Sequence, residues 1–209
     1  MAGAFFVFEG GDGVGKTTQA DLLATWLMGA GFSVVCTFEP GDTAAGATMR
    51  SIVLDPRTGD LDPWAEALLY AADKAQHLHE VVRPALDHGA VVVCDRYVDS
   101  MLAYQGAGRT LPMAQVEQVA AWATGGLVPD LTVLLDLEPE QGVGRLVDLD
   151  RVEAAGDDFH VRVREEFLAL AARDPARYLV VPARWPALRI ADEVRDRAIT
   201  VLSDPDRIL

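Results

Sequence analysis

The feature that most constrains this chain is a glycine-rich segment near its start, Gly10-Gly11-Asp12-Gly13-Val14-Gly15-Lys16-Thr17. It fits the pattern G-x-x-x-x-G-K-[ST], follows the apolar run 4–8 and precedes a helical pattern. Glycines allow the backbone to turn its N–H groups toward a polyphosphate and to approach it closely. The segment therefore predicts a phosphate-binding P-loop rather than a glycine-rich turn without a ligand.

The rest of the motif supplies charge and a metal ligand. The helix that follows would direct its positive dipole end at the same phosphates. Lys16 can reach the β and γ oxygens of a nucleoside triphosphate, and the Thr17 hydroxyl can bind Mg²⁺. The first functional prediction is thus a nucleotide site with Mg²⁺ as cofactor.

Length and charge limit the remaining possibilities. At 209 residues, half of them apolar, we expect a single enzyme-sized domain over residues 1–209. No apolar run approaches the length of a membrane span, and the N-terminus does not resemble a leader, which predicts a cytoplasmic protein without a membrane partner. The formal net charge of −14 argues against a broad nucleic-acid surface.

Cysteines and histidines form no metal or redox motif by spacing. Cys36 and Cys94 lie far apart in apolar runs, which predicts two buried free thiols. The histidines are interpreted as mostly solvated; they are His77, His79, His88 and His160.

Strand and helix patterns alternate along the chain. They predict a three-layer P-loop fold, an α/β architecture with a parallel, about five-stranded sheet covered by helices on both faces. The expected strands are 4–8, 33–38, 90–94, 131–137 and 178–181. The expected helices are 17–28, 44–53, 63–82, 98–105, 112–123, one from about 139, one around 159–170, and 185–202. Pro84 is expected to bend the end of the third helix, and residues 106–109 to divide the next two.

Two further segments carry functional predictions. Asp95 and Arg96 follow a buried strand, at the edge where α/β sheets bind ligands. The carboxylate can bind Mg²⁺, and the guanidinium can bind the phosphate of a second substrate, although a loop or N-cap Asp is the alternative. Between about 147 and 158 the apolar periodicity lapses, which predicts a mobile lid.

Several short motifs together resemble the thymidylate kinase family. They are Phe8 to Thr18, Glu39-Pro40-Gly41, Tyr70 to Lys74, Asp95-Arg96-Tyr97, Ser100 with Tyr104-Gln105-Gly106, and Pro129-Asp130-Leu131. They follow one another in the family's order over nearly the whole chain. The resemblance implies phosphoryl transfer from ATP to dTMP, giving dTDP and ADP for dTTP synthesis, by a homodimer that uses Mg²⁺.

The resemblance also implies roles for single residues. For ATP these are Gly10, Gly11, Asp12, Gly13, Val14, Gly15, Lys16, Thr17 and Thr18, and for the metal Thr17 and Asp95. For the acceptor they are Asp12, Glu39, Pro40, Tyr70, Lys74, Arg96, Ser100 and Tyr104. The implied catalytic set is Lys16, Arg96, Arg151 and Asp12; Arg151 is the expected lid arginine because Arg145 is predicted to lie on a helix. The Glu39–Pro40 bond is expected to be cis.

Within the acceptor set, the family pattern gives each side chain a separate task. Tyr70 would stack on the thymine, and Ser100 and Lys74 would contact the edge of the base. Asp12 would meet the sugar 3′-hydroxyl, Arg96 would bind the phosphate, and Tyr104 would disfavour a ribose 2′-hydroxyl.

Some positions depart from the family pattern and leave alternatives open. Family members often carry Arg at positions 38 and 74 and Gly at position 42, where this chain has Phe38, Lys74 and Asp42. A nucleoside or deoxynucleoside (monophosphate) kinase with a shifted acceptor is therefore one alternative. A P-loop ATP-dependent switch is another, although the absence of asparagine rules out an N-K-x-D guanine-reading motif.

Overall fold

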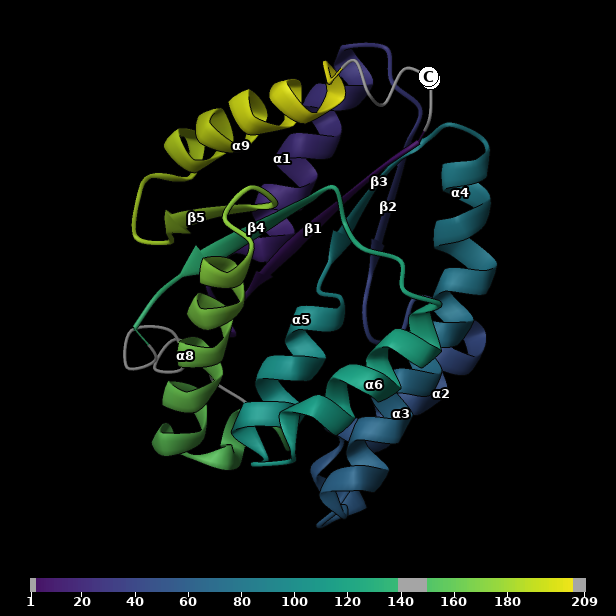
Figure 1. Cartoon of the computed structure of the whole chain (residues 1–209), viewed down its shortest axis with the longest axis vertical. Helices are drawn as coiled ribbons and strands as arrows, with labels where there is room; N and C mark the ends of the chain where they lie inside the picture. The colour runs from purple at the N-terminus through teal and green to yellow at the C-terminus, as the bar shows by residue number, and fades with distance from the viewer. Residues whose placement is uncertain (1–2, 139–149, 205–209) are drawn as a thin grey trace.

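The computed structural model describes residues 3–138 and 150–204, which fold around one five-stranded sheet (Figure 1). The strands lie in the order β2-β3-β1-β4-β5, and neighbours are parallel throughout. Their bounds are β1 Ala4–Gly10, β2 Val34–Phe38, β3 Val91–Asp95, β4 Leu131–Asp136 and β5 Tyr178–Pro182. This confirms the predicted α/β fold.

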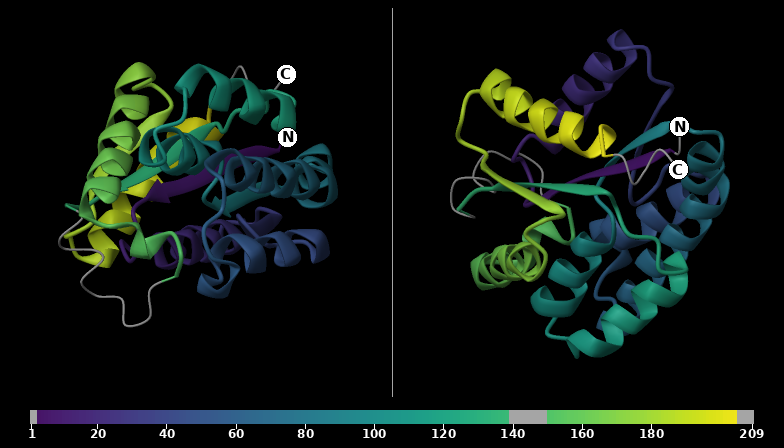
Figure 2. Two further views of the ribbon diagram at one scale, coloured as in Figure 1. Left: turned by 90° about the horizontal axis from the view of Figure 1, so that it is seen from below. Right: turned by 45° about the horizontal axis from the view of Figure 1, so that its top comes forward.

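Helices cover both faces of the sheet, and the side chains of β1 alternate between them. Phe6 and Phe8 belong to a core with α1 (Lys16–Gly29) and α9 (Ala187–Leu202). The right-hand view of Figure 2 shows these two helices side by side. Phe5 and Val7 point to the opposite face, where Tyr97 packs against them. Coverage on both faces explains why the central strands read as uninterrupted apolar runs.

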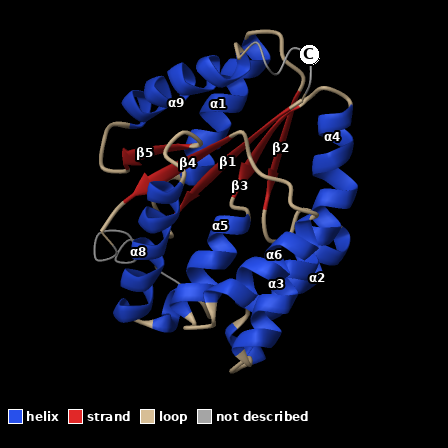
Figure 3. Cartoon of the chain, in the orientation of Figure 1, coloured by secondary structure: helices blue, strands red, loops and turns tan. Residues whose placement is uncertain are grey.

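The second face carries most of the helices (Figure 3). The elements on this side are α2 Ala44–Leu54, η1 Pro56–Thr58, α3 Pro63–His77, η2 Leu78–Val82, α4 Arg83–Asp87, α5 Val98–Met101, η3 Leu102–Gly108, α6 Met113–Thr124 and α8 Asp157–Arg173. The helix α3 begins at Pro63, as predicted, and the Asp62 side chain caps its N-terminus.

Two helix boundaries differ from the sequence prediction. The helical path of α3 passes through the π-helical η2 and continues as α4 to Asp87, beyond the expected end near position 82. A π-helical turn just before Pro84 accommodates a residue that lacks a backbone N–H. The break expected at 106–109 lies later, because the π-helical η3 extends to Gly108.

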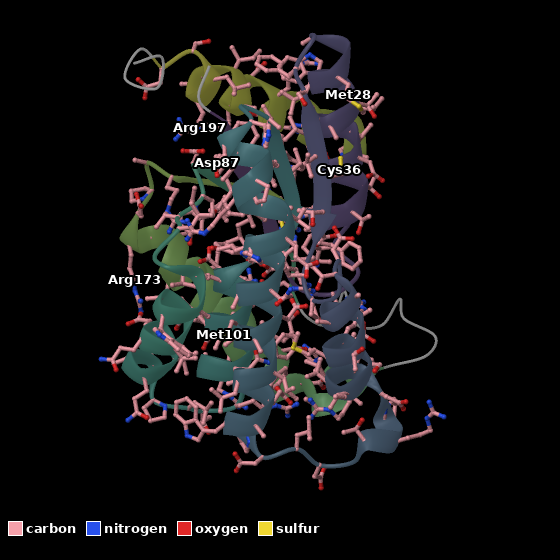
Figure 4. The ribbon with its side chains drawn as sticks, turned by 90° about the vertical axis from the view of Figure 1, so that its right-hand side faces the viewer. Met28, Cys36, Asp87, Met101, Arg173 and Arg197 are labelled. Atoms are coloured by element: carbon pink, nitrogen blue, oxygen red, sulfur yellow. The ribbon has the colours of Figure 1, made fainter. Side chains whose placement is uncertain are left out.

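Burial corrects two predictions about cysteine and histidine. Cys94 is buried as expected, but Cys36 is exposed on β2, an edge strand whose outer side is only partly covered (Figure 4). His77 and His160 are buried, while His79 and His88 are exposed. His77 faces β2 from α3, where a carboxylate replaces the water that a histidine would otherwise contact.

The predicted lid is only partly covered by the described residues. The helix expected from about 139, and positions 147–149 of the lid, lie outside them. The remainder contains the short helix η5 (Glu153–Ala155), and α8 begins at Asp157, inside the segment expected to be aperiodic. No helix in ranges 3–138 and 150–204 is long and apolar enough to cross a membrane.

Candidate active site

The P-loop connects the end of β1 to the start of α1, as predicted. Gly15 is the N-cap of α1 with a left-handed φ of 96°, and Gly13 has a φ of 72°. Side chains other than glycine rarely adopt such values. The Lys16 ammonium group lies over the loop and donates to the Gly10 carbonyl at 3.2 Å and the Gly11 carbonyl at 2.6 Å. The lysine thus sits where it could exchange these carbonyls for phosphate oxygens.

Burial perturbs the Lys16 ammonium group. Its removal from water, and next the repulsion from Arg96, lower the pKa of Lys16 to about 8. The carboxylates of Asp12, Asp95 and Glu9 act in the opposite direction without cancelling the effect. A bound polyphosphate would favour the charged form again.

Thr17 and Asp95 form the candidate metal site. The Thr17 hydroxyl donates to Asp95 Oδ2 at 2.6 Å, and Asp95 ends β3 in register with Phe8 of β1. Among the residues the structure describes, no group of three or more His, Cys, Asp or Glu side chains could hold a metal alone. A hydroxyl and one carboxylate still fit Mg²⁺, which usually binds one or two protein oxygens and completes its shell with phosphates and water.

Arg96 lies between the P-loop and the start of α5. Its backbone has a left-handed φ of 69°, unusual for arginine, and its N–H donates to the Phe8 carbonyl at 2.9 Å. The guanidinium donates to the Gly10 carbonyl at 3.1 Å and to Ser100 Oγ at 3.0 Å, and it forms an ion pair with Asp12. The side chain is therefore fixed at the phosphate-binding end of the fold.

Asp12 and Tyr104 complete the group around Arg96. The Tyr104 hydroxyl donates to Asp12 Oδ2 at 2.7 Å. The guanidinium carbon of Arg96 lies 5.1 Å from the centre of the Tyr104 ring. Burial would raise the pKa of Asp12, but the charges of Arg96 and Lys16 lower it below its ordinary value. Asp12 is consequently held as a carboxylate acceptor.

A buried carboxylate supports the turn that carries Arg96. Glu9 accepts hydrogen bonds from the backbone N–H groups of Tyr97 at 2.8 Å and Ser100 at 3.2 Å, and from Ser100 Oγ at 2.6 Å. Burial, and next the charge of Asp99, raise the pKa of Glu9 to about 7. Sequence analysis assigned Glu9 no separate role, because its partners lie nearly ninety positions away.

One cavity beside the P-loop brings together all the predicted acceptor residues. Asp12, Glu39, Pro40, Tyr70, Lys74, Arg96, Ser100 and Tyr104 all line it. An open pocket around Lys16, Thr17 and Asp95 adjoins it, and the two share Asp12 and Arg96. The predicted acceptor residues, which come from four segments of the chain, therefore meet in one cavity beside the phosphate-binding loop.

Lys74 is buried in the wall of this cavity, where it forms an ion pair with Glu39. Its ammonium donates to Glu39 Oε2 at 2.6 Å, and both side chains are buried. Burial would raise the pKa of Glu39, but Lys74 and His77 together lower it. The Glu39–Pro40 peptide bond is cis, as expected.

Arg151 is not among the residues that line this cavity, although Asp150 and Val152 on either side of it are; its side chain is held against α2 and α3. Its Nε donates to the Val53 carbonyl at 2.9 Å, and its guanidinium forms an ion pair with Glu66. Arg109 pairs with the same carboxylate at 3.1 Å. The described contacts of Arg151 are thus structural in this conformation, and Arg145 lies outside the described residues.

The structure adds two residues that sequence analysis missed. Arg50 lines both pockets, donates to the Pro40 carbonyl at 2.7 Å and lies 5.8 Å from the centre of the Phe38 ring. His77 contacts Glu39 from α3. The spacing of Tyr70, Lys74 and His77 by four and three residues places them on one helix face and could have indicated the histidine.

A P-loop, an aspartate at the end of the neighbouring parallel strand and an adjoining cavity with arginine define a P-loop kinase that acts on small phosphorylated acceptors. Comparison with known proteins narrows this class. The family model "Thymidylate kinase" matches residues 8–194, and the chain belongs to this family.

Relatives and a solved structure agree with the family model. The chain is 57% identical over 203 residues to the thymidylate kinase of Cutibacterium acnes, covering 97% of this chain and 100% of the relative. It is 54% identical over 207 residues to that of Clavibacter sepedonicus, covering 97% and 98%. The crystal structure of thymidylate kinase from Ehrlichia chaffeensis matches with a TM-score of 0.77 and 30% identity, covering 97% of this chain and 100% of the other.

Proposed function

We propose that this protein transfers the γ-phosphoryl group of ATP to the 5′-phosphate of dTMP, giving dTDP and ADP in dTTP synthesis. The observation that carries the proposal is the junction of the two pockets, because Asp12 and Arg96 line both the P-loop pocket and the acceptor cavity. An acceptor phosphate bound at Arg96 would lie beside a donor phosphate bound at Lys16. Such positioning supplies much of the catalysis in phosphoryl transfer.

The reaction needs no strong general base. An oxygen of the acceptor phosphate attacks the γ-phosphorus, and the bond to the β,γ-bridging oxygen breaks as ADP leaves. The second pKa of a phosphate monoester is about 6, so at neutral pH the attacking group is mostly a dianion. The protein therefore acts by orienting the two phosphates and neutralising charge, for which Lys16 and Arg96 are the proposed catalytic cations.

Thr17 and Asp95 are the proposed ligands of Mg²⁺. When bound, the ion would neutralise charge on the donor phosphates. The direct hydrogen bond between the two side chains keeps the Thr17 hydroxyl and an Asp95 carboxylate oxygen next to each other. The backbone of Gly10 to Thr18 would hold the donor phosphates through its N–H groups.

The acceptor roles follow the lining of the cavity. Tyr70 would stack on the thymine, and Lys74 and Ser100 would contact the edge of the base. The 3′-hydroxyl would donate to Asp12, whose ionised state Arg96 maintains. Tyr104, whose hydroxyl donates to Asp12 Oδ2, would disfavour a ribose 2′-hydroxyl. Arg50 offers a second guanidinium for the phosphates.

Further parts of the proposal concern the lid and the assembly. Arg151 would leave Glu66 and stabilise the negative charge of the transition state. It would do so as part of a lid at about 147–158, within a single domain formed by residues 1–209.

We also propose a cytoplasmic homodimer that binds neither nucleic acid nor membrane. Sedimentation velocity at several concentrations tests the dimer; a single monomeric species at all of them would contradict it.

An acceptor panel tests the activity itself. The protein with ATP and Mg²⁺ is given thymidine, dTMP, dUMP, dCMP, dGMP and dAMP in turn, and ADP formation is measured. We expect the largest kcat/KM with dTMP. Preference for thymidine would favour a nucleoside kinase, and preference for another monophosphate would indicate a shifted acceptor. If ATP is hydrolysed at the same rate with and without an acceptor, the result would favour a P-loop switch.

A further inference from the structure

Arg50 differs from the other two described cations that line the acceptor cavity. Lys74 forms an ion pair with Glu39. Arg96 forms one with Asp12. No carboxylate among the described residues pairs with Arg50, which lines both the acceptor cavity and the P-loop pocket. Its guanidinium can therefore take a phosphate as its counter-ion, but it has no ion pair that would fix its direction beforehand.

The turn between β2 and α2 holds Arg50 in place of an ion pair. Arg50 Nη1 donates to the Pro40 carbonyl at 2.7 Å. The aliphatic part of its side chain packs closely on Gly41: a Cβ added to this glycine would lie 2.8 Å from Arg50 Cδ and 3.3 Å from Arg50 Cβ. The direction of the guanidinium consequently depends on where Pro40 and Gly41 lie.

Asp73 binds this turn from α3. Its Oδ1 accepts a hydrogen bond from the Gly41 N–H at 3.0 Å. The side chain is buried, and Oδ2 has no hydrogen-bond partner in ranges 3–138 and 150–204. Asp73 lines neither pocket. A carboxylate that is buried with one oxygen unpartnered is costly to desolvate, and the hydrogen bond that it does make goes to the turn that holds Arg50.

Gly46 allows the Asp73 carboxylate to reach the turn. This glycine lies in the first turn of α2, where its N–H donates to Thr43 Oγ1 at 2.9 Å. A Cβ added to Gly46 would lie 2.5 Å from Asp73 Oδ1 and 3.3 Å from the Cα of Gly41. The first distance is much shorter than a non-bonded contact allows. Any side chain at position 46 would therefore push the carboxylate away from Gly41.

We propose that Asp73 is a positioning residue that holds Gly41 and thereby keeps the Arg50 guanidinium at the junction of the two pockets, where it would bind the 5′-phosphate of dTMP. The inference rests on the proposed function and extends it to a residue outside both pockets. Without the carboxylate, the Gly41 N–H loses its partner, and the turn and Arg50 can shift together.

The loss of Asp73 should affect one end of the acceptor cavity and spare the other. Glu39 precedes the turn, but Lys74 and His77 hold its carboxylate by hydrogen bonds of their own. The groups proposed to contact the base should therefore stay in place. The effect on a ligand should fall on its phosphate.

The position of Arg50 is tested first, without any substrate. Crystal structures of the unaltered protein and of Asp73→Ala are determined, both without ligand. We expect Arg50 Nη1 to leave the Pro40 carbonyl in the variant, while the ion pair between Lys74 and Glu39 is retained. If Arg50 keeps the same place in both structures, the proposal is wrong.

The effect on the ligand is tested by titration calorimetry with dTMP and with thymidine, which lacks the phosphate. We expect Asp73→Ala to weaken dTMP binding about tenfold, the scale of one charge-assisted hydrogen bond, and to leave thymidine binding within about twofold. In an Arg50→Met background, Asp73→Ala should weaken dTMP binding no further. An equal loss for both ligands, or an undiminished loss in the Arg50→Met background, would overturn the positioning role.

A second variant keeps the test decisive if Asp73→Ala does not fold. Gly46→Ala should displace the carboxylate and cause the same selective loss of dTMP binding. Its matched control is Gly29→Ala at the end of α1, where an added Cβ would meet nothing within 4 Å, and which should bind both ligands as the unaltered protein does. An unchanged preference for dTMP over thymidine in Gly46→Ala would contradict the proposal.

Failure of the proposed function gives a different result. If the unaltered protein binds dTMP no more tightly than thymidine, the proposed acceptor is wrong. The position of Arg50 in the two ligand-free structures still decides whether Asp73 holds it.

Discussion

The loop proposed for the donor phosphates and the cavity proposed for the acceptor are built differently. The loop is one contiguous segment, Gly10 to Thr18, in which Lys16 donates to carbonyls of the loop itself. The cavity collects side chains from distant segments, and its charges are held by one another: Arg96 with Asp12, and Lys74 with Glu39.

This difference determines what a substitution does. Within the loop, Lys16 bonds carbonyls rather than a carboxylate, so removing its charge strands no ion-pair partner and activity can fall while the fold remains. Removing a charge from the cavity leaves a buried partner uncompensated, which is strongly destabilising. The loss of activity should therefore occur without a loss of stability at Lys16, whereas the two losses should occur together at the ion-paired residues of the cavity.

The largest effect is expected for Lys16→Ala. Loss of a cation that acts on the transferring group should lower kcat by several orders of magnitude, at least the about 10³ that such charges supply. The melting temperature should be unchanged or slightly higher, because the folded protein already disfavours the charged ammonium. ADP formation and thermal unfolding are the measurements. Near-normal turnover would contradict the assignment of this loop as the donor-phosphate site. A large loss of stability would contradict the proposed difference between Lys16 and the ion-paired residues of the cavity.

Arg151→Ala should lower kcat by about 10³, the lower end of what an arginine supplied to such a site contributes. Because Arg151 also pairs with Glu66, the variant Arg109→Ala is the control: it removes the other guanidinium from the same carboxylate. Arg109→Ala should leave kcat within a few-fold of the unaltered protein. If Arg145→Ala lowers kcat and Arg151→Ala does not, Arg151 is the wrong residue.

Lys74→Met tests the cavity half of the comparison. It keeps most of the volume but leaves Glu39 without its ion-pair partner, which should cost about 3–5 kcal/mol of folding free energy. Urea denaturation of this variant beside Lys16→Ala measures the difference. Equal stability of the two variants would show that the buried pair does not support the fold.

Lys74→Arg should act on binding with a smaller effect. An arginine can bond Glu39 with one nitrogen and a base carbonyl with another, whereas a lysine donates from a single nitrogen. One charge-assisted hydrogen bond is worth about 1.5–3 kcal/mol, so the KM for dTMP should fall about ten- to a hundredfold with ATP saturating. The KM for ATP should not change. An unchanged KM for dTMP would show that position 74 does not contact the acceptor.

The same contrast explains which parts of the molecule sequence could predict. The P-loop was predictable because the residues that perform its chemistry are adjacent in the chain. The central strands were predictable because both faces are covered. Cys36 was misplaced because an apolar run does not reveal whether its strand lies at the edge of the sheet, and strand order depends on pairing between distant segments.

The acceptor cavity was predictable only where family motifs marked its residues. Arg50 and His77 escaped because their roles depend on which groups the fold places opposite them, namely the Pro40 carbonyl and Glu39. The helix boundary near Pro84 was misplaced for a similar reason. A proline signals a stop, and only the packed structure reveals that a π-helical turn carries the helix through it.

The smallest effect is expected from pH and concerns the loop alone. With the pKa of Lys16 lowered to about 8, the nucleotide-free protein loses this proton as the pH rises through that value. The charged form binds phosphate, so kcat/KM for ATP should be level near pH 7 and fall above pH 8, approaching tenfold for each further unit. The acceptor phosphate is already ionised in this range. Lys16→Arg is the control, since arginine stays protonated; its residual activity should not fall. A wild-type profile that stays flat to about pH 9 would show that Lys16 keeps its proton despite burial.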